Sequence, residues 1–100
     1  MKRLLPSTAR MTKRIQFKVG GEVQGVNFRS AACKQANRIG VTGWVANASD
    51  GTVRGEAQGS DDALDEFIQH LNKGPPAAHV SGVEHSDMAE KAGESGFEVK

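Results

Sequence analysis

The sequence predicts an α+β sandwich in which two helices cover one face of an antiparallel sheet. Segments whose apolar residues alternate with polar ones are interspersed with two segments of helical period, in the order β-α-β-β-α-β. The tight-turn segment Ser49-Asp50-Gly51 joins two consecutive strands and makes that pair antiparallel. A chain of 100 residues, 37% of them hydrophobic and 25% charged, is long enough for one modest core but not for two.

The first half of the chain contains a strand, a loop and a helix. The strand is predicted at residues 14–19, where three apolar residues share one face: Ile15, Phe17 and Val19. Gly20-Gly21 ends this alternation, and a loop continues to about Val26. Helical spacing begins at Asn27, whose side chain is predicted to cap the first turn, and the helix stops at Gly40.

The middle of the chain contains two strands, at residues 41–48 and 52–58, followed by a second helix. Gly59 ends the second of these strands, and Ser60 is the predicted N-cap of the helix. Two acidic residues in the first turn favour the helix dipole, and the helix ends before Gly74. Its apolar stripe consists of Leu64, Phe67, Ile68 and Leu71.

Three further segments complete the chain: a less regular strand at residues 80–88, a polar loop at 89–96 and a short strand at 97–99. Two helices on one face of an antiparallel sheet, in this order, form the ferredoxin-like arrangement, here with a short extra C-terminal strand. We expect residues 13–100 to form this domain and residues 1–12 to be a disordered N-terminal extension.

Composition and charge argue against several functional classes. Thirteen basic and twelve acidic residues leave a net charge of +1, which supplies little long-range attraction to nucleic acid or to an anionic membrane. The sequence has no apolar run long enough to cross a bilayer. Residues 1–10 are basic but hold a single apolar pair, too short for a secretory signal. We therefore expect a cytoplasmic monomer, with organelle targeting through residues 1–10 as the alternative.

The stretch GEVQGVNFR, residues 21–29, has the parts of a phosphate-binding loop. A glycine-flanked turn that leads into a helix gathers main-chain amides at the positive end of the helix dipole. Arg29 follows early in the helix, where its guanidinium can bind two phosphate oxygens. The candidate loop residues are Gly21, Glu22, Val23, Gln24, Gly25, Val26, Asn27 and Phe28. Glycine-rich turns between strands and helices are mostly only turns, so this stretch alone establishes no function.

Two stretches together resemble the signatures of the acylphosphatase family. The first reads Gly-x-Val-Gln-Gly-Val-x-aromatic-Arg and is matched by Gly21, Val23, Gln24, Gly25, Val26, Phe28 and Arg29. The second reads Gly-aromatic-Val-x-Asn-x-x-x-Gly-x-Val and is matched by Gly43, Trp44, Val45, Asn47, Gly51 and Val53. The resemblance in element order spans about residues 13–100, and the family's fold is the same ferredoxin-like sandwich.

The resemblance implies hydrolysis of acyl phosphates to a carboxylate and inorganic phosphate. In the implied site, the loop amides and Arg29 bind the phosphoryl group, and Asn47 positions the attacking water. The family needs no metal or other cofactor. The implied partners are a small-molecule acyl phosphate and inorganic phosphate, which is the product and an expected competitive inhibitor. Ala46 departs from the family pattern, where a basic residue often precedes the asparagine, and this departure removes a contribution to substrate attraction.

Two other functions can be compared with the sequence: a module that only binds phosphate, and an RNA-binding domain. A module that only binds phosphate would need Arg29 and the loop but not the water-positioning amide of Asn47, so Asn47 favours an enzyme. An RNA-binding domain of similar strand order would need exposed aromatic residues and a basic surface. The chain has five aromatic residues, three of which are assigned to the core: Phe17, Phe28 and Phe67. Trp44 is expected in the core or as a wall beside the site.

No function is predicted for the remaining polar residues. Asn47-Ala48-Ser49 matches an N-glycosylation pattern, but without a secretory signal we expect no glycan. Three histidines lack the spacing of a metal site: His70, His79 and His85. Cys33 is expected to be a partly buried, inert thiol within a helix.

Overall fold

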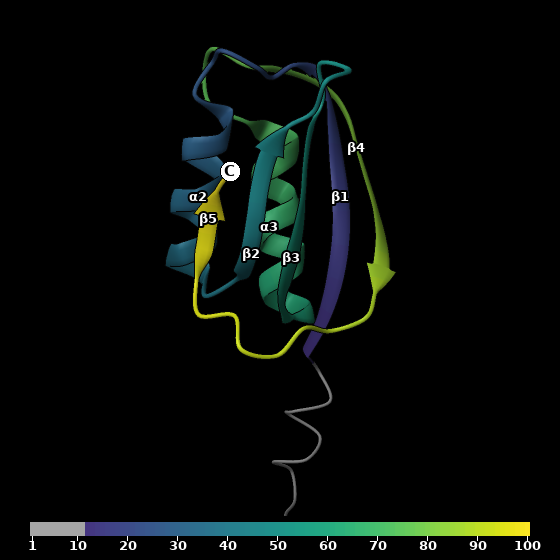
Figure 1. The fold of residues 1–100 in the computed structure, drawn as a ribbon. Helices are drawn as coiled ribbons and strands as arrows, with labels where there is room; N and C mark the ends of the chain where they lie inside the picture. Colours follow the sequence, from purple (N-terminus) through teal and green to yellow (C-terminus); the bar gives the residue numbers. More distant parts are fainter. Residues whose placement is uncertain (1–11) are drawn as a thin grey trace, which may run out of the picture.

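The computed structural model describes residues 12–100, and within them two helices and five strands follow the predicted order (Figure 1). The elements are β1 (Thr12–Glu22), α2 (Phe28–Ile39), β2 (Thr42–Asn47), β3 (Val53–Ser60), α3 (Asp61–Lys73), β4 (His79–Met88) and β5 (Phe97–Val99). Residues 1–11 of the predicted extension lie outside the described residues, whereas Thr12 already belongs to β1. Neither of the two helices is long and apolar enough to cross a membrane.

The five strands form one sheet in the order β4-β1-β3-β2-β5. All neighbouring strands are antiparallel except β5, which runs parallel to β2. The prediction of an antiparallel sheet is therefore wrong at this edge, and the sheet is mixed. The cause lies in the loop at residues 89–96, which crosses beneath the sheet from the end of β4 to the start of β5 (Figure 1). A strand that enters from that end must run in the same direction as β2.

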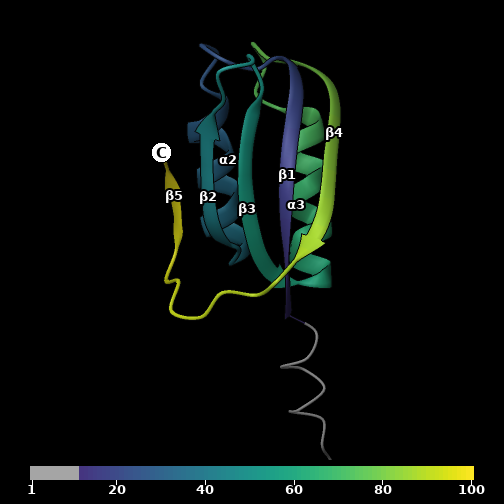
Figure 2. The same ribbon diagram turned by 45° about the vertical axis from the view of Figure 1, so that its right-hand side comes forward.

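Both helices pack on one face of the sheet and leave the other face, here called the outer face, without helices (Figure 2). The core lies between the sheet and the helices. The predicted apolar faces of β1 and α3 are buried in it, and so are apolar residues of β3; among these buried residues are Ile15, Phe17, Val19, Val53, Ala57, Leu64, Phe67 and Leu71. The Phe67 ring lies 5.6 Å from the ring of Phe17 and 5.4 Å from that of Phe97, which joins α3 to both halves of the sheet.

The first strand is longer than predicted, because Gly20 and Gly21 continue it instead of ending it. The pairing of β1 with β4 shifts register between these two glycines. Gly21 has φ +119°, and a Cβ added there would lie 2.1 Å from the main-chain oxygen of His79. Glycine at this position therefore serves the close approach of β4. The third strand likewise continues past Gly59 to Ser60.

The two helices begin by different means. Ser60 caps α3 as predicted, since its hydroxyl accepts a hydrogen bond from the amide of Ala63 at 3.1 Å. Asn27 stands at the N-cap position of α2, but its side chain makes no capping bond, so that part of the prediction is wrong. Its backbone is left-handed, with φ 66°, a conformation that asparagine tolerates better than most residues.

A buried charge on the outer face was missed by the sequence analysis. Arg14 is only 1% exposed. Its guanidinium donates to both carboxylate oxygens of Glu94, at 2.8 and 3.1 Å, and its Nε donates to Glu56 at 3.0 Å. Gln58 holds the loop that contains Glu94, because its side chain accepts from the amide of Lys91 and donates to the oxygen of Lys91. The loop at residues 89–96 therefore covers one end of the outer face.

The hydrogen bonds from Arg14 hold the pKa of Glu94 below its ordinary value of 4.5. A carboxylate whose pKa is lowered by folding stabilises the folded state above its ordinary pKa. That stabilisation is lost as the pH falls through the lowered value. Glu94→Gln should therefore reduce the free energy of unfolding at neutral pH by about 1–3 kcal/mol, and the difference from the parent should shrink in acid.

Urea unfolding of the parent and of Glu94→Gln at a series of pH values measures this difference. Glu90→Gln is the matched control, because Glu90 is an exposed acid in the same loop. Equal losses in the two variants, or a difference from the parent that does not change with pH, would contradict the role assigned to the Arg14–Glu94 pair.

Candidate functional site

The loop between β1 and α2 is anchored at both ends and exposed in its middle. Val23 and Phe28 are 1% and 2% exposed and belong to the core, and Val26 packs against it. Gln24, Gly25 and Asn27 are exposed. The packed side chains hold the loop in place, and the residues between them are open to solvent.

The loop is shorter than predicted at its N-terminal end. Gly21 and Glu22 belong to β1, where they pair with Val80 and His79 of β4. Their main-chain groups are therefore part of the sheet. The predicted loop residues outside regular structure are Val23, Gln24, Gly25, Val26 and Asn27, and Phe28 opens the helix.

The backbone of the loop has the geometry of an anion-binding concavity. Gly25 and Asn27 are both left-handed, with φ 77° and 66°. The amide of Ala31 donates the first helical hydrogen bond, to the oxygen of Asn27 at 3.1 Å. The amides of residues 27–30 precede that bond and lie at the positive end of the helix dipole. No acidic residue occupies the first turn of α2, so nothing there opposes an anion.

Arg29 borders the same concavity. It lines a cavity of about 290 Å³ together with Gly25, Asn27, Phe28, Ser30 and Val99. Its side chain is partly exposed, and its Nη1 donates to the main-chain oxygen of Lys100 at 2.9 Å. Lys100 is itself fixed, because its amide donates to the oxygen of Val45 in β2 at 2.8 Å. The segment that follows β5 therefore helps to orient the arginine beside the loop.

Asn47 lies at the same end of the sheet as the loop between β1 and α2. It is the exposed last residue of β2. The Gln24 side chain donates to the main-chain oxygens of Ala48 and Thr52, at 2.8 and 2.9 Å, and so ties the loop to the turn that follows Asn47. Within residues 12–100 no hydrogen bond joins Asn47 to Arg29. The structure thus brings the second motif to the first through Gln24, a contact that the sequence analysis did not predict.

The turn after Asn47 is held by Asp50. One carboxylate oxygen of Asp50 accepts from the hydroxyl of Thr52 at 2.6 Å and from its amide at 3.0 Å. These two bonds lower the pKa of Asp50 to about 2. The turn therefore keeps its ionised acceptor at any pH near neutrality.

The other residues singled out in the sequence make no hydrogen bond with Arg29 among the described residues. Trp44 is partly exposed on the outer face and not part of the core, and it lines the same groove as Asn47. Cys33 is half-buried on α2, and its Sγ donates to the oxygen of Phe97 at 3.3 Å. His70 lies on α3, 3.9 Å from the carboxylate of Glu66, and the other two histidines lie on β4. Among the described residues, no group of three or more metal-ligating side chains gathers.

Comparison with known proteins gives a consistent result. The acylphosphatase family model matches residues 15–99. The acylphosphatase of Rubrobacter xylanophilus is 44% identical over 93 residues, covering 93% of this chain and 84% of the relative. The structure of an acylphosphatase from Coxiella burnetii has a TM-score of 0.88 at 34% identity, covering 96% of this chain and 100% of its own. An acylphosphatase from Bacillus subtilis has a TM-score of 0.84 at 30% identity, covering 90% and 99%.

The contact of Gln24 with the turn generates a prediction about anion binding. Gln24→Ala removes both hydrogen bonds that hold the loop against Ala48 and Thr52. The loop must then be ordered when the anion binds, so we expect the affinity for inorganic phosphate to fall about tenfold. The measurement is the rise of Tm with phosphate concentration, from which Kd is obtained for parent and variant.

Gln35→Ala is the control for this measurement, because Gln35 is a partly exposed glutamine on α2 whose side chain bonds only Arg38 among the described residues. Its phosphate affinity should match that of the parent. An unchanged Kd in Gln24→Ala would show that the loop is ordered without this contact.

Proposed function

Since this chain belongs to the acylphosphatase family, and is therefore a hydrolase that acts on acyl phosphates, we propose that the loop amides and Arg29 hold the phosphoryl group while Asn47 orients the attacking water. The observation that carries the proposal is the cavity shared by the left-handed loop, the first turn of α2 and Arg29. All its anion-binding groups come from one continuous stretch, residues 24–30.

The chemistry suits a site built from amides and one arginine. An acyl phosphate releases a carboxylate, which is a weak base, so departure of the leaving group needs no strong general acid. Phosphoryl transfer chiefly requires alignment and stabilisation of the charge on the phosphoryl oxygens. The amides supply fixed donors, and the guanidinium supplies a permanent positive charge.

Arg29 keeps donors for the substrate while it is held in place. A guanidinium carries five N–H donors, and Arg29 gives one of them to the main-chain oxygen of Lys100. The remaining donors serve the phosphoryl oxygens. Fixing the side chain before the substrate arrives lowers the entropy lost on binding.

Asn47 orients water and does not accept its proton, because a side-chain amide has no basicity near neutral pH. In the proposed step, the water oxygen forms a bond to phosphorus as the bond from phosphorus to the acyl oxygen breaks. The carboxylate leaves with the bonding electron pair. One of the two protons of the water passes to a phosphoryl oxygen, and the other stays on the attacking oxygen. The products are the carboxylate and inorganic phosphate, which then competes with new substrate for the loop.

We also propose a substrate class, a cellular location and an oligomeric state. The substrate is a small-molecule acyl phosphate, and the charge on its phosphoryl group is met by protein groups without a metal ion. The position of Asn47 at the end of the sheet beside the loop supports a site that also directs water, and not one that only binds phosphate. We propose that the protein works as a cytoplasmic monomer.

Three variants test the assigned roles through the loss of benzoyl phosphate, followed by ultraviolet absorbance in the presence of EDTA. Arg29→Ala should lower kcat/KM about 10³-fold, and Arg29→Lys should recover little of it, because an ammonium cannot bond two oxygens side by side. Asn47→Ala should lower kcat about 10²-fold. Its affinity for inorganic phosphate should stay close to that of the parent.

Arg38→Ala is the matched control, since Arg38 is an exposed arginine on the same helix, paired with Glu66 at 2.8 Å. It should keep the activity of the parent. Phosphate binding by a parent that has no turnover would support the binding module instead. An Asn47→Ala variant with full kcat would remove that residue from the mechanism.

A further inference from the structure

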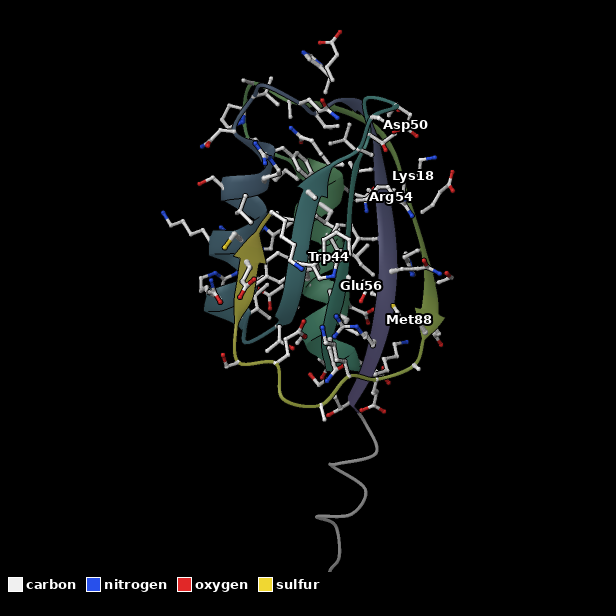
Figure 3. All side chains as sticks on the ribbon, in the orientation of Figure 1. Lys18, Trp44, Asp50, Arg54, Glu56 and Met88 are labelled. Atoms are coloured by element: carbon white, nitrogen blue, oxygen red, sulfur yellow. The ribbon has the colours of Figure 1, made fainter. Side chains whose placement is uncertain are left out.

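The outer face of the sheet carries a groove next to Asn47. It has a volume of about 680 Å³, and its lining includes Lys18, Trp44, Ala46, Asn47, Arg54 and Glu56. Figure 3 shows Arg54 beside Lys18, with Trp44 and Glu56 farther along the same face. The groove is larger than the cavity of about 290 Å³ beside Arg29, and of the residues assigned to the phosphate site only Asn47 lines it.

The strand register explains why the groove lies there. Ala46, Arg54 and Lys18 are neighbours across β2, β3 and β1, and they form one row of side chains on the outer face. Trp44 and Glu56 are neighbours in the next row. The loop at residues 89–96 covers only the far end of this face, at Arg14, so the rows nearer Asn47 remain open.

Most charges around the groove already have partners. Glu56 is paired with Arg14 at 2.9 Å, and Lys18 is paired with Asp50 at 3.5 Å. Arg54 is exposed and takes part in none of the ion pairs found among residues 12–100. Its neighbour Ala46 has the smallest side chain with a Cβ, so the guanidinium has room on that side.

Two other charged residues near the groove also take part in none of these pairs: Glu84, which lines the groove beyond Lys18, and Lys100, whose Nζ lies 5.2 Å from the centre of the Trp44 ring. β1 separates Glu84 from Arg54, so Arg54 is a cation on the Ala46 side of the groove that is available to a ligand.

The groove meets the phosphate site at Asn47 and Ala48, which line its end. The loop reaches the same place, since Gln24 donates to the oxygen of Ala48. A substrate whose phosphoryl group lies on the loop can thus extend its acyl group past Asn47 and onto the outer face. There the indole of Trp44 and the methyl of Ala46 offer apolar surface, and Arg54 offers a positive charge.

We propose, on the basis of the function proposed above, that this groove binds the acyl group of the substrate and that Arg54 binds a second anionic group carried by it. The favoured substrates are then acyl phosphates that bear a carboxylate or phosphate away from the reacting bond. The permanent charge and forked donors of arginine suit either group. Arg54 is a specificity residue, and it takes no part in the bond-breaking step.

A matched pair of substrates tests this inference: benzoyl phosphate and 4-carboxybenzoyl phosphate, which differ by one carboxylate. The quantity measured is the ratio of kcat/KM for the carboxylated substrate to that for the plain one, in the parent, in Arg54→Gln and in Arg38→Gln. Arg54→Gln should lower this ratio about five- to tenfold through a higher KM for the carboxylated substrate. Arg38→Gln removes the same charge from the opposite side of the molecule and should keep the ratio of the parent.

Each outcome has a distinct meaning. An equal fall of the ratio in both variants would overturn the inference, because it would mean that only net charge matters. An unchanged ratio in Arg54→Gln would overturn it as well, while benzoyl phosphate turnover by the parent would leave the proposed function standing. A parent that hydrolyses neither substrate would contradict the proposed function and this inference together.

Discussion

The pairing of Arg14 with Glu94 determines where the last part of the chain lies. The chain between β4 and β5 is polar and has no apolar face with which to pack against the sheet. It is held instead by one buried guanidinium, which meets carboxylates from two segments, and by the side chain of Gln58. With that loop fixed, β5 starts at the edge of β2 and runs parallel to it. The oxygen of Lys100 then reaches Arg29.

Stability and function are thus arranged at opposite ends of one sheet. At one end the loop over Arg14 closes the outer face, and at the other end the loop between β1 and α2, which we propose binds phosphate, meets the turn after Asn47. β5 connects them, because it begins near the first network and ends beside Arg29. The outer face between the two ends stays open and forms the groove that we propose for the acyl group.

Features that depend on neighbours in the chain were predicted well. The helical spacing of Leu64, Phe67 and Leu71 placed α3 on the core, and Ser60 caps it as its position before two acids indicated. The alternation in β1 identified its buried face. The two motifs identified the family that the comparisons show. Each of these signals is contained within one or two turns of a helix or a few neighbouring residues of the chain.

The sequence by itself determined the order of elements, the buried faces of β1 and α3 and the loop that leads into α2, because these follow from local periodicity and turn chemistry. Only the tertiary structure decided that Arg14 is buried and that β5 is parallel. It alone decided that Gln24 joins the two motifs by bonding the oxygens of Ala48 and Thr52, which lie 24 and 28 residues farther along the chain. It also decided that Gly21 serves the close approach of β4 and does not open the loop. The reason is physical: each of these features depends on a group supplied by a distant part of the chain, and no local pattern specifies which group that will be.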